Sequence, residues 1–130
     1  MNPNVNLNDK TVLVVEDELF LAEKISEQLF VLGVKEVLTA TNLNDAEKHI
    51  QDDQIDLALL DVNLPNGDTT AELGKCLAAE NVPVVFFSGY SASELVRKAA
   101  KHEFLEKPLS LPRLKASMHR AVVRASSLQM

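Results

Sequence analysis

The sequence predicts an α/β domain with a doubly wound sheet of five parallel strands in the order 2-1-3-4-5. Short apolar runs alternate with longer amphipathic segments along the chain, which is typical of β/α repeats. The run at 56–60 is apolar almost throughout, as in strands that helices cover on both faces. A chain of 130 residues has room for five such units in one domain, joined by right-handed crossovers.

Three strands and two helices are expected in the first half of the chain. The strands are short apolar runs at residues 11–15, 36–40 and 56–60. The first helix covers residues 18–32, and Gly33 ends it. Its apolar stripe consists of Leu21, Ile25, Leu29 and Leu32. The second helix covers residues 42–52 and carries acidic residues near its start, where the helix dipole favours them.

The second half continues the alternation after a loop at 61–67 that is rich in Pro, Asn and Gly. Helices are expected at 69–79, at 91–101 behind a capping box, and from Ser110 to about 126 with Pro112 in the first turn. The two strands between them are expected at 82–87 and 103–106. We therefore expect a domain at residues 10–126, with flexible termini at 1–9 and 127–130.

The composition excludes several classes of protein. No apolar stretch approaches the ~20 residues of a membrane span. Residues 1–10 lack the basic and apolar regions of a signal peptide. Cys76 is the only cysteine, which excludes an internal disulfide and indicates a reducing cytoplasm. We expect a cytoplasmic protein without membrane contact.

The net charge of -6 is unevenly distributed. Residues 1–90 carry 16 acidic and 5 basic side chains, whereas residues 91–130 carry 3 acidic and 8 basic ones. An acidic body lacks the positive surface that nucleic acids require, so no nucleic-acid partner is expected. The basic last third is either a partner surface or a set of solvated helix faces, and the charge pattern leaves both interpretations open.

Five polar residues follow predicted strands at the point where each strand ends. They are Glu16, Asp17, Asp61, Ser88 and Lys107. Each alone has a structural interpretation, such as a helix cap, an Asx turn or a surface lysine. The carboxyl ends of parallel strands meet at one edge of a sheet, so all five are expected there. Carboxylates without nearby thiols or imidazoles favour Mg²⁺ or Mn²⁺, and the ammonium and hydroxyl suit a phosphoryl group.

Four segments of the chain resemble the receiver domain of two-component response regulators. They are residues 12–18 (VLVVEDE), 61–65 (DVNLP), 86–89 (FFSG) and 104–108 (FLEKP). The resemblance covers about residues 10–126 and implies the flavodoxin-like fold of that family. It also implies a phosphoprotein of a phosphorelay. We expect a stand-alone single-domain receiver if the chain is complete, and the receiver part of a larger protein if it is a fragment.

The resemblance assigns a role to each residue of the predicted edge. Asp61 is expected to accept a phosphoryl group from a phosphohistidine on a histidine kinase or histidine phosphotransfer protein. Asp17 and Asp61 are expected to ligate Mg²⁺ directly, Glu16 through water, and Asn63 through its backbone carbonyl. Lys107 is expected to contact a phosphoryl oxygen.

The family also implies a conformational switch. Ser88 would contact the phosphoryl group and move toward it, and Phe104, three residues before Lys107, would then turn inward. This change would alter the contacts with an output protein that the sequence does not identify. A homodimer through the last two helices is one assembly that the family implies.

The first predicted helix carries more apolar residues than its buried stripe requires. Leu19 and Phe30 project almost opposite the stripe, and Phe20 lies beside it. These residues are either ordinary exposed apolar side chains or a docking surface for the phosphodonor.

Two other functions remain as alternatives to a phosphoacceptor. The first is a pseudo-receiver adaptor that works without phosphorylation, against which the complete set of rim residues argues. The second is a Mg²⁺-dependent phosphohydrolase with Asp61 as nucleophile, for which a general acid and a substrate cap are not evident. We therefore expect a signalling domain rather than an enzyme, with self-phosphorylation and autodephosphorylation as its only reactions.

Overall fold

The computed structural model describes residues 6–62, 64, 69–89 and 103–128. Five parallel strands form one sheet in the order β2-β1-β3-β4-β5, as the sequence predicts. The strands are β1 (Thr11–Val15), β2 (Glu36–Ala40), β3 (Leu57–Asp61), β4 (Val84–Ser88) and β5 (Glu103–Glu106). From β1 the chain adds β2 on one side, and from β3 onward it adds strands on the other side. The ends of β1 and β3 therefore border the crevice where doubly wound sheets bind ligands.

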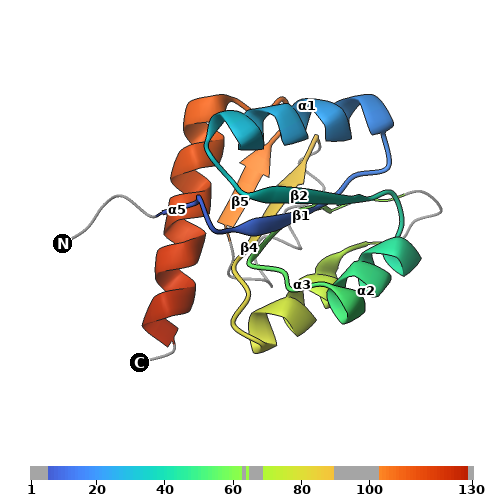
Figure 1. Ribbon diagram of the computed structural model, residues 1–130. Helices are drawn as coiled ribbons and strands as arrows, with labels where there is room; N and C mark the ends of the chain where they lie inside the picture. The colour runs from blue at the N-terminus through green and yellow to red at the C-terminus, as the bar shows by residue number, and fades with distance from the viewer. Residues whose placement is uncertain (1–5, 63, 65–68, 90–102, 129–130) are drawn as a thin grey trace.

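Helices cover both faces of this sheet. Those in the described residues are α1 (Leu19–Val31), α2 (Leu43–Asp52), α3 (Ala71–Ala79) and α5 (Leu111–Leu128). Figure 1 shows α1 and α5 on one side of the sheet and α2 and α3 on the other. The helix predicted at 91–101 lies outside the described residues. None of the described helices is both long and apolar enough to cross a bilayer.

Strand residues alternate between two apolar clusters, one on each face of the sheet. In β1, Val12 and Val14 belong to the cluster under α1 and α5, while Leu13 and Val15 belong to the cluster over α2 and α3. All four side chains are fully buried. Residues 12–15 of β1 and 57–60 of β3 are apolar at every position because both faces of these central strands are covered.

The bounds of two strands differ from the prediction, and both strands end one residue later than expected, at the rim. β3 runs to Asp61, so Asp61 is the last residue of a strand rather than the first residue of a loop. β4 runs from Val84 to Ser88 instead of 82–87. Val82 donates its N–H to the Leu77 carbonyl at the end of α3, and Pro83 has no N–H to donate. Asp61 and Ser88 are therefore held in the sheet itself.

The helix bounds differ by two residues at the start of α3 and at the end of α5, and by at most one residue elsewhere among the described helices. α3 begins at Ala71, two residues later than expected, because Thr70 still pairs with the end of β3. α5 extends to Leu128, two residues beyond the predicted end. At its other end the Arg113 N–H donates to Ser110 Oγ at 3.3 Å, as expected of a capping serine.

The packing of α1 is centred on a slightly different stripe from the predicted one. Ala22, Ile25 and Leu29 are buried, whereas Leu21 and Leu32 at the edges are only partly buried. Leu7, which precedes the predicted domain start at residue 10, is also buried in the cluster under α1 and α5.

Gly74 lets α3 approach the sheet closely. A Cβ atom at this position would lie 2.4 Å from Cζ of the Phe86 ring, which is far inside van der Waals contact. Phe86 itself is fully buried in β4. The start of α3 is therefore fixed against the strand beside β3.

Candidate functional site

The carboxyl edge of the sheet brings together the five residues predicted to form the site. Glu16 and Asp17 follow β1, Asp61 ends β3 and Ser88 ends β4. Lys107 follows β5, and its N–H donates to the Ser88 carbonyl at 2.8 Å. Asn63, the predicted backbone ligand, lies outside the described residues. The shared edge follows from the parallel ladder, whose strands all end at the same level.

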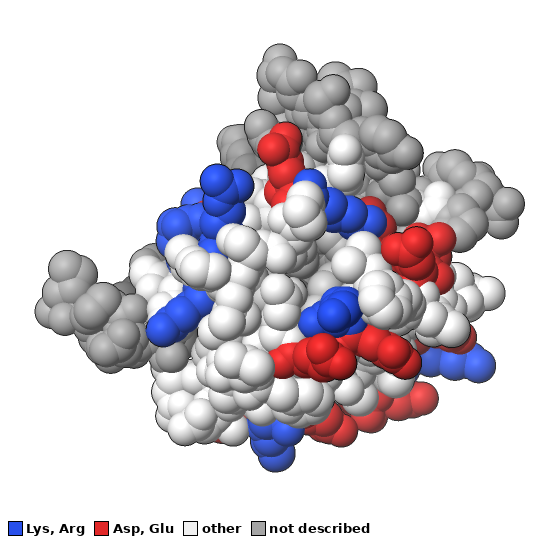
Figure 2. Space-filling model, turned by 90° about the horizontal axis from the view of Figure 1, so that it is seen from above, with Lys and Arg blue, Asp and Glu red and all other residues white. Residues whose placement is uncertain are grey.

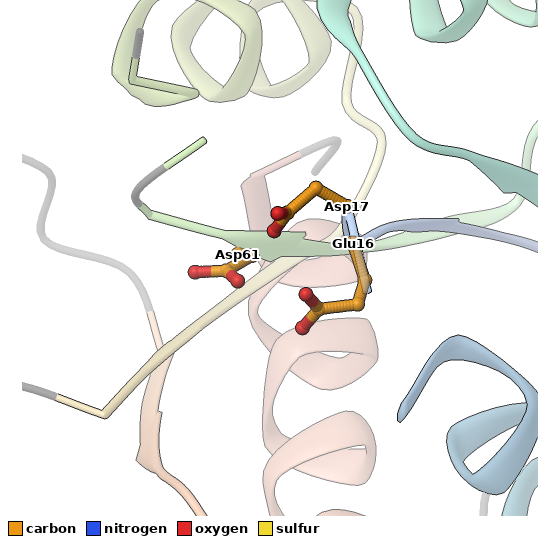
Figure 3. Close-up of side chains that lie close together, drawn as sticks. All are labelled: Glu16, Asp17 and Asp61. Carbon is orange, nitrogen blue, oxygen red and sulfur yellow. The ribbon is translucent and has the colours of Figure 1, made fainter. Parts of the chain in front are cut away.

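Three carboxylates at this edge form a compact acidic group. Glu16, Asp17 and Asp61 each offer one oxygen, and these oxygens lie within 4.8 Å of one another. Figure 3 shows the carboxylates of Glu16 and Asp17 approaching Asp61 from the end of β1. Glu16 and Asp61 are buried, with 1% and 4% exposure, whereas Asp17 is exposed. The group is thus anchored in the fold on one side and open to solvent on the other.

Lys107 supplies the counter-charge for two of these carboxylates. Its Nζ lies 2.9 Å from Asp61 Oδ2 and 3.0 Å from Glu16 Oε1. Burial on its own would lower the pKa of Lys107, but the hydrogen bond to Asp61 and the charges of Asp61 and Glu16 outweigh burial and raise it. The same ammonium lies 5.5 Å from the centroid of the Phe87 ring. Lys107 is therefore a charged group held in one place.

Glu16 is the least satisfied member of the acidic group. Burial raises the pKa of Glu16 to about 7, and the charge of Asp61 adds to that effect. Oε2 accepts a hydrogen bond from the Glu18 N–H at 3.1 Å. Oε1 forms an ion pair with Lys107 that lacks hydrogen-bond geometry, and no other donor within the described residues reaches it. A buried carboxylate oxygen without a donor, beside two further carboxylates, fits a divalent cation of the Mg²⁺ or Mn²⁺ kind.

Replacing Glu16 by Gln should stabilise the fold in EDTA, and by more at pH 7.5 than at pH 5. The pKa of Glu16 in the folded chain, about 7, lies above the ordinary 4.5. Between these two pH values the folded chain keeps the proton of the Glu16 carboxyl group, whereas the unfolded chain has lost it. The free energy of unfolding therefore falls by about 2–3 kcal/mol as the pH rises from 4.5 to 7. The Glu16→Gln variant avoids this loss, because an amide does not titrate. Urea unfolding at both pH values measures the difference.

The exposed Glu47→Gln on α2 is the matched control and should show no such pH trend. Added Mg²⁺ should reverse the order of stability, because only the glutamate gains a cation partner. A stability difference between Glu16→Gln and the unmutated chain that is the same at pH 5 and pH 7.5 would contradict the interpretation.

The two predicted switch residues lie in neighbouring strands. Ser88 is 1% exposed at the end of β4, and its register partner in β5 is Glu106. Phe104 is partly buried and packs against the cluster over α2 and α3. Its register partner in β4 is Phe86. Phe104 is therefore two residues before the register partner of Ser88 on the neighbouring strand.

The exposed apolar residues of α1 lie where the helical projection predicts. Leu19, Phe20 and Phe30 are 68%, 69% and 55% exposed. Beside them, a groove of about 360 Å³ runs between α1 and the segment after Lys107, with Leu21, Ile25, Pro108 and Leu109 among its lining residues. Figure 2 views the molecule from the α1 side and shows uncharged side chains over much of its centre, with acidic side chains gathered at the right and lower margins.

Two residues at the rim were not predicted from the sequence. Phe87 places its ring beneath the Lys107 ammonium, and the sequence pattern marked it only as a strand residue. Thr70 donates its hydroxyl to the Asp61 carbonyl at 2.9 Å, nine residues away along the chain. The sequence placed Thr70 in the helix expected at 69–79 and contained no signal for this contact.

The sheet order and the acidic rim together define a class, the CheY-like α/β domains. A CheY-like receiver from Methanospirillum hungatei JF-1 shares the fold with a TM-score of 0.78 over 92% of this chain and 98% of that one, at 20% identity. The chain belongs to the response regulator receiver domains, because the model of that family matches residues 12–119.

Individual relatives agree with this assignment. RssB of Serratia marcescens, a swarming motility regulation protein, is 33% identical over 107 residues, or 79% of this chain and 48% of RssB. The transcriptional regulatory protein DpiA of Escherichia coli K12 is 33% identical over 92% of this chain and 55% of DpiA. SdrG from Sphingomonas melonis Fr1 is 30% identical with a TM-score of 0.76, over 89% of this chain and 98% of SdrG. The chain thus spans about half the length of RssB and of DpiA.

Proposed function

We propose that this receiver domain accepts a phosphoryl group on Asp61 from a phosphohistidine of a histidine kinase or phosphotransfer protein. The observation that carries the proposal is the Lys107 ammonium at 2.9 Å from Asp61 Oδ2, beside two further carboxylates. Phosphoryl transfer depends on positioning and on neutralising charge more than on covalent help from the protein. The rim supplies both features.

The residues of the rim have separate tasks in the transfer. A carboxylate oxygen of Asp61 attacks phosphorus, a P–O bond forms and the P–N bond to the donor imidazole breaks. Lys107 neutralises charge on a transferring oxygen. Asp17 and Asp61 would hold Mg²⁺ with Glu16 behind a water and the carbonyl of Asn63, and the cation would neutralise further charge. Glu16 would also keep Lys107 in place.

Ser88 and Phe104 would carry the signal from the rim to the surface. Ser88 ends β4, the strand next to β3, and we expect its hydroxyl to approach a new phosphoryl oxygen. Movement of β4 there would change the packing of Phe104 in β5. Phe104 borders a surface hollow lined also by Arg113 and Arg120, where an output protein or a second copy of the chain would detect the change.

Incubation with Mg²⁺ and acetyl phosphate, followed by intact-mass measurement, tests the proposed function. One phosphoryl group should be gained with Mg²⁺ and none in EDTA. No adduct would favour a phosphorylation-independent pseudo-receiver. Turnover of generic phosphoesters without an adduct would favour the phosphohydrolase instead. The domain bounds of 10–126 would be tested by the same reaction on a chain trimmed to those residues.

Replacing both Leu19 and Phe20 by Ser should slow transfer from a protein phosphodonor about tenfold, since a docked donor would remove both exposed apolar side chains from water. Transfer from acetyl phosphate should be unchanged, because neither side chain belongs to the rim. The donor for this assay is chosen by comparing phosphotransfer proteins and taking the one that phosphorylates the unmutated chain fastest.

Two further variants define the extent of this surface. Phe30 lies 11 residues after Leu19, or about 16 Å along α1, so Phe30→Ser reports whether the donor covers the whole helix. Val123→Ser, on α5 and 49% exposed, is the matched control. Equal loss of both reactions in the Leu19 and Phe20 variant would exclude a docking role.

A further inference from the structure

Thr70 connects the phosphoacceptor strand to the start of α3. Its side chain is fully buried, and its hydroxyl donates to the Asp61 carbonyl at 2.9 Å. Its N–H donates to the next carbonyl, that of Val62, at 3.2 Å. One residue therefore donates to two successive carbonyls at the end of β3.

The sheet alone leaves this end of β3 with less support than the rest of the strand. The pairing of β1 with β3 ends at Val15 and Leu60, one residue before Asp61. The next N–H of the chain after β1, that of Glu16, donates to Ala40 of β2 instead. On the other side, the Val62 N–H donates to the Phe87 carbonyl at 2.9 Å. The Thr70 hydroxyl thus supports the Asp61 carbonyl just past the point where the β1 ladder stops.

Thr70 is itself held firmly. Its carbonyl accepts a hydrogen bond from the Gly74 N–H at 2.9 Å, at the first turn of α3. At Gly74 that helix lies so close to the Phe86 ring that a Cβ atom would not fit. The hydroxyl of Thr70 is therefore fixed by a helix that has no room to shift toward the sheet.

We propose that Thr70 is a positioning residue for phosphoryl transfer, which acts by fixing the backbone of Asp61. This inference rests on the proposed function of Asp61. The backbone of Asp61 determines where its carboxylate lies relative to Lys107 and the other two carboxylates. A displacement of about 1 Å in a reacting group can cost about a hundredfold in rate, so a lost support at this carbonyl has a measurable effect.

Three variants test the role against a purely structural one. Thr70→Val keeps the shape and removes the hydroxyl, and Thr70→Ser keeps the hydroxyl and removes the methyl group. Ser117→Ala is the matched control, because Ser117 is also fully buried and donates to the Glu103 side chain at 3.0 Å, away from the rim. For each variant we would measure the rate of phosphorylation by acetyl phosphate, the Mg²⁺ affinity and the free energy of unfolding. The first two are measured well below the unfolding temperature of the variant.

Thr70→Val should lower the phosphorylation rate and the Mg²⁺ affinity about tenfold, while Thr70→Ser stays within about twofold of the unmutated chain. Ser117→Ala should lose comparable stability and keep both functions. If Thr70→Val does not fold, Thr70→Ala takes its place. A Thr70→Val protein that is destabilised but reacts and binds Mg²⁺ normally would overturn the proposal. If the unmutated chain accepts no phosphoryl group, the proposed function fails, and the Mg²⁺ affinities alone then decide the positioning role.

Discussion

Replacing Asp61 by Asn should abolish phosphoryl uptake from acetyl phosphate and from any phosphohistidine donor, by at least about a thousandfold. The amide keeps the size of the side chain and removes the nucleophilic oxygen. The variant should still fold, because the substitution removes one negative charge from beside the buried Glu16. Intact mass after incubation with Mg²⁺ and acetyl phosphate measures the loss.

A second site of modification is the outcome that would count against Asp61 as acceptor. Asp17 is an exposed carboxylate in the same acidic group, so it is the natural competitor. Peptide mapping of the phosphorylated unmutated chain should place the group on the peptide that contains Asp61. Asp17→Asn, in contrast, should retain the acceptor and lose Mg²⁺ affinity. Unchanged uptake by Asp61→Asn would contradict the assignment.

Replacing Lys107 by Met should slow phosphoryl uptake by about a hundredfold or more, as is typical when one group that stabilises transition-state charge is removed. It should also destabilise the metal-free fold by about 3 kcal/mol, because two buried carboxylates lose their cation. Mg²⁺ should recover much of the stability, since it neutralises the same carboxylates, but it should not recover the rate. Urea unfolding with and without Mg²⁺ and the acetyl phosphate rate separate the two effects.

Two controls distinguish charge from geometry at Lys107. Lys75→Met makes the same chemical change at an exposed ion pair on α3, where about 0–1 kcal/mol and no rate change are expected. Lys107→Arg keeps the positive charge in a longer, planar group, so it should restore stability without restoring the full rate. A Lys107→Met rate equal to that of Lys75→Met would remove Lys107 from the transfer.

The fold was predictable because its local signals and its tertiary arrangement agree. The apolar runs at 11–15, 36–40 and 103–106 coincide with β1, β2 and β5. The bounds of β3 and β4 were less accurate because the residues there change from apolar to polar within the strand. Whether Asp61 and Ser88 pair with neighbours depends on the register of β3 with β4, which pairs Asp61 with Phe87. No local pattern reports that register.

The rim was predictable as a set of residues but not as a set of contacts. Parallel strands end at one edge, so Glu16, Asp17, Asp61, Ser88 and Lys107 had to meet there. The sequence did not indicate that Lys107 lies between Glu16 and Asp61, or that Glu16 is buried with an unsatisfied oxygen. These features depend on side-chain directions and on burial.

The sequence by itself determined the succession of strands and helices, the shared edge and the chemical types of the groups at it, because periodicity and strand ends are properties of neighbours along the chain. Only the tertiary structure decided how those groups are held. The clearest case is Thr70, whose hydroxyl reaches the Asp61 carbonyl across nine residues of chain. Such a contact depends on where α3 packs against Phe86, and packing is set by the whole fold rather than by any local pattern.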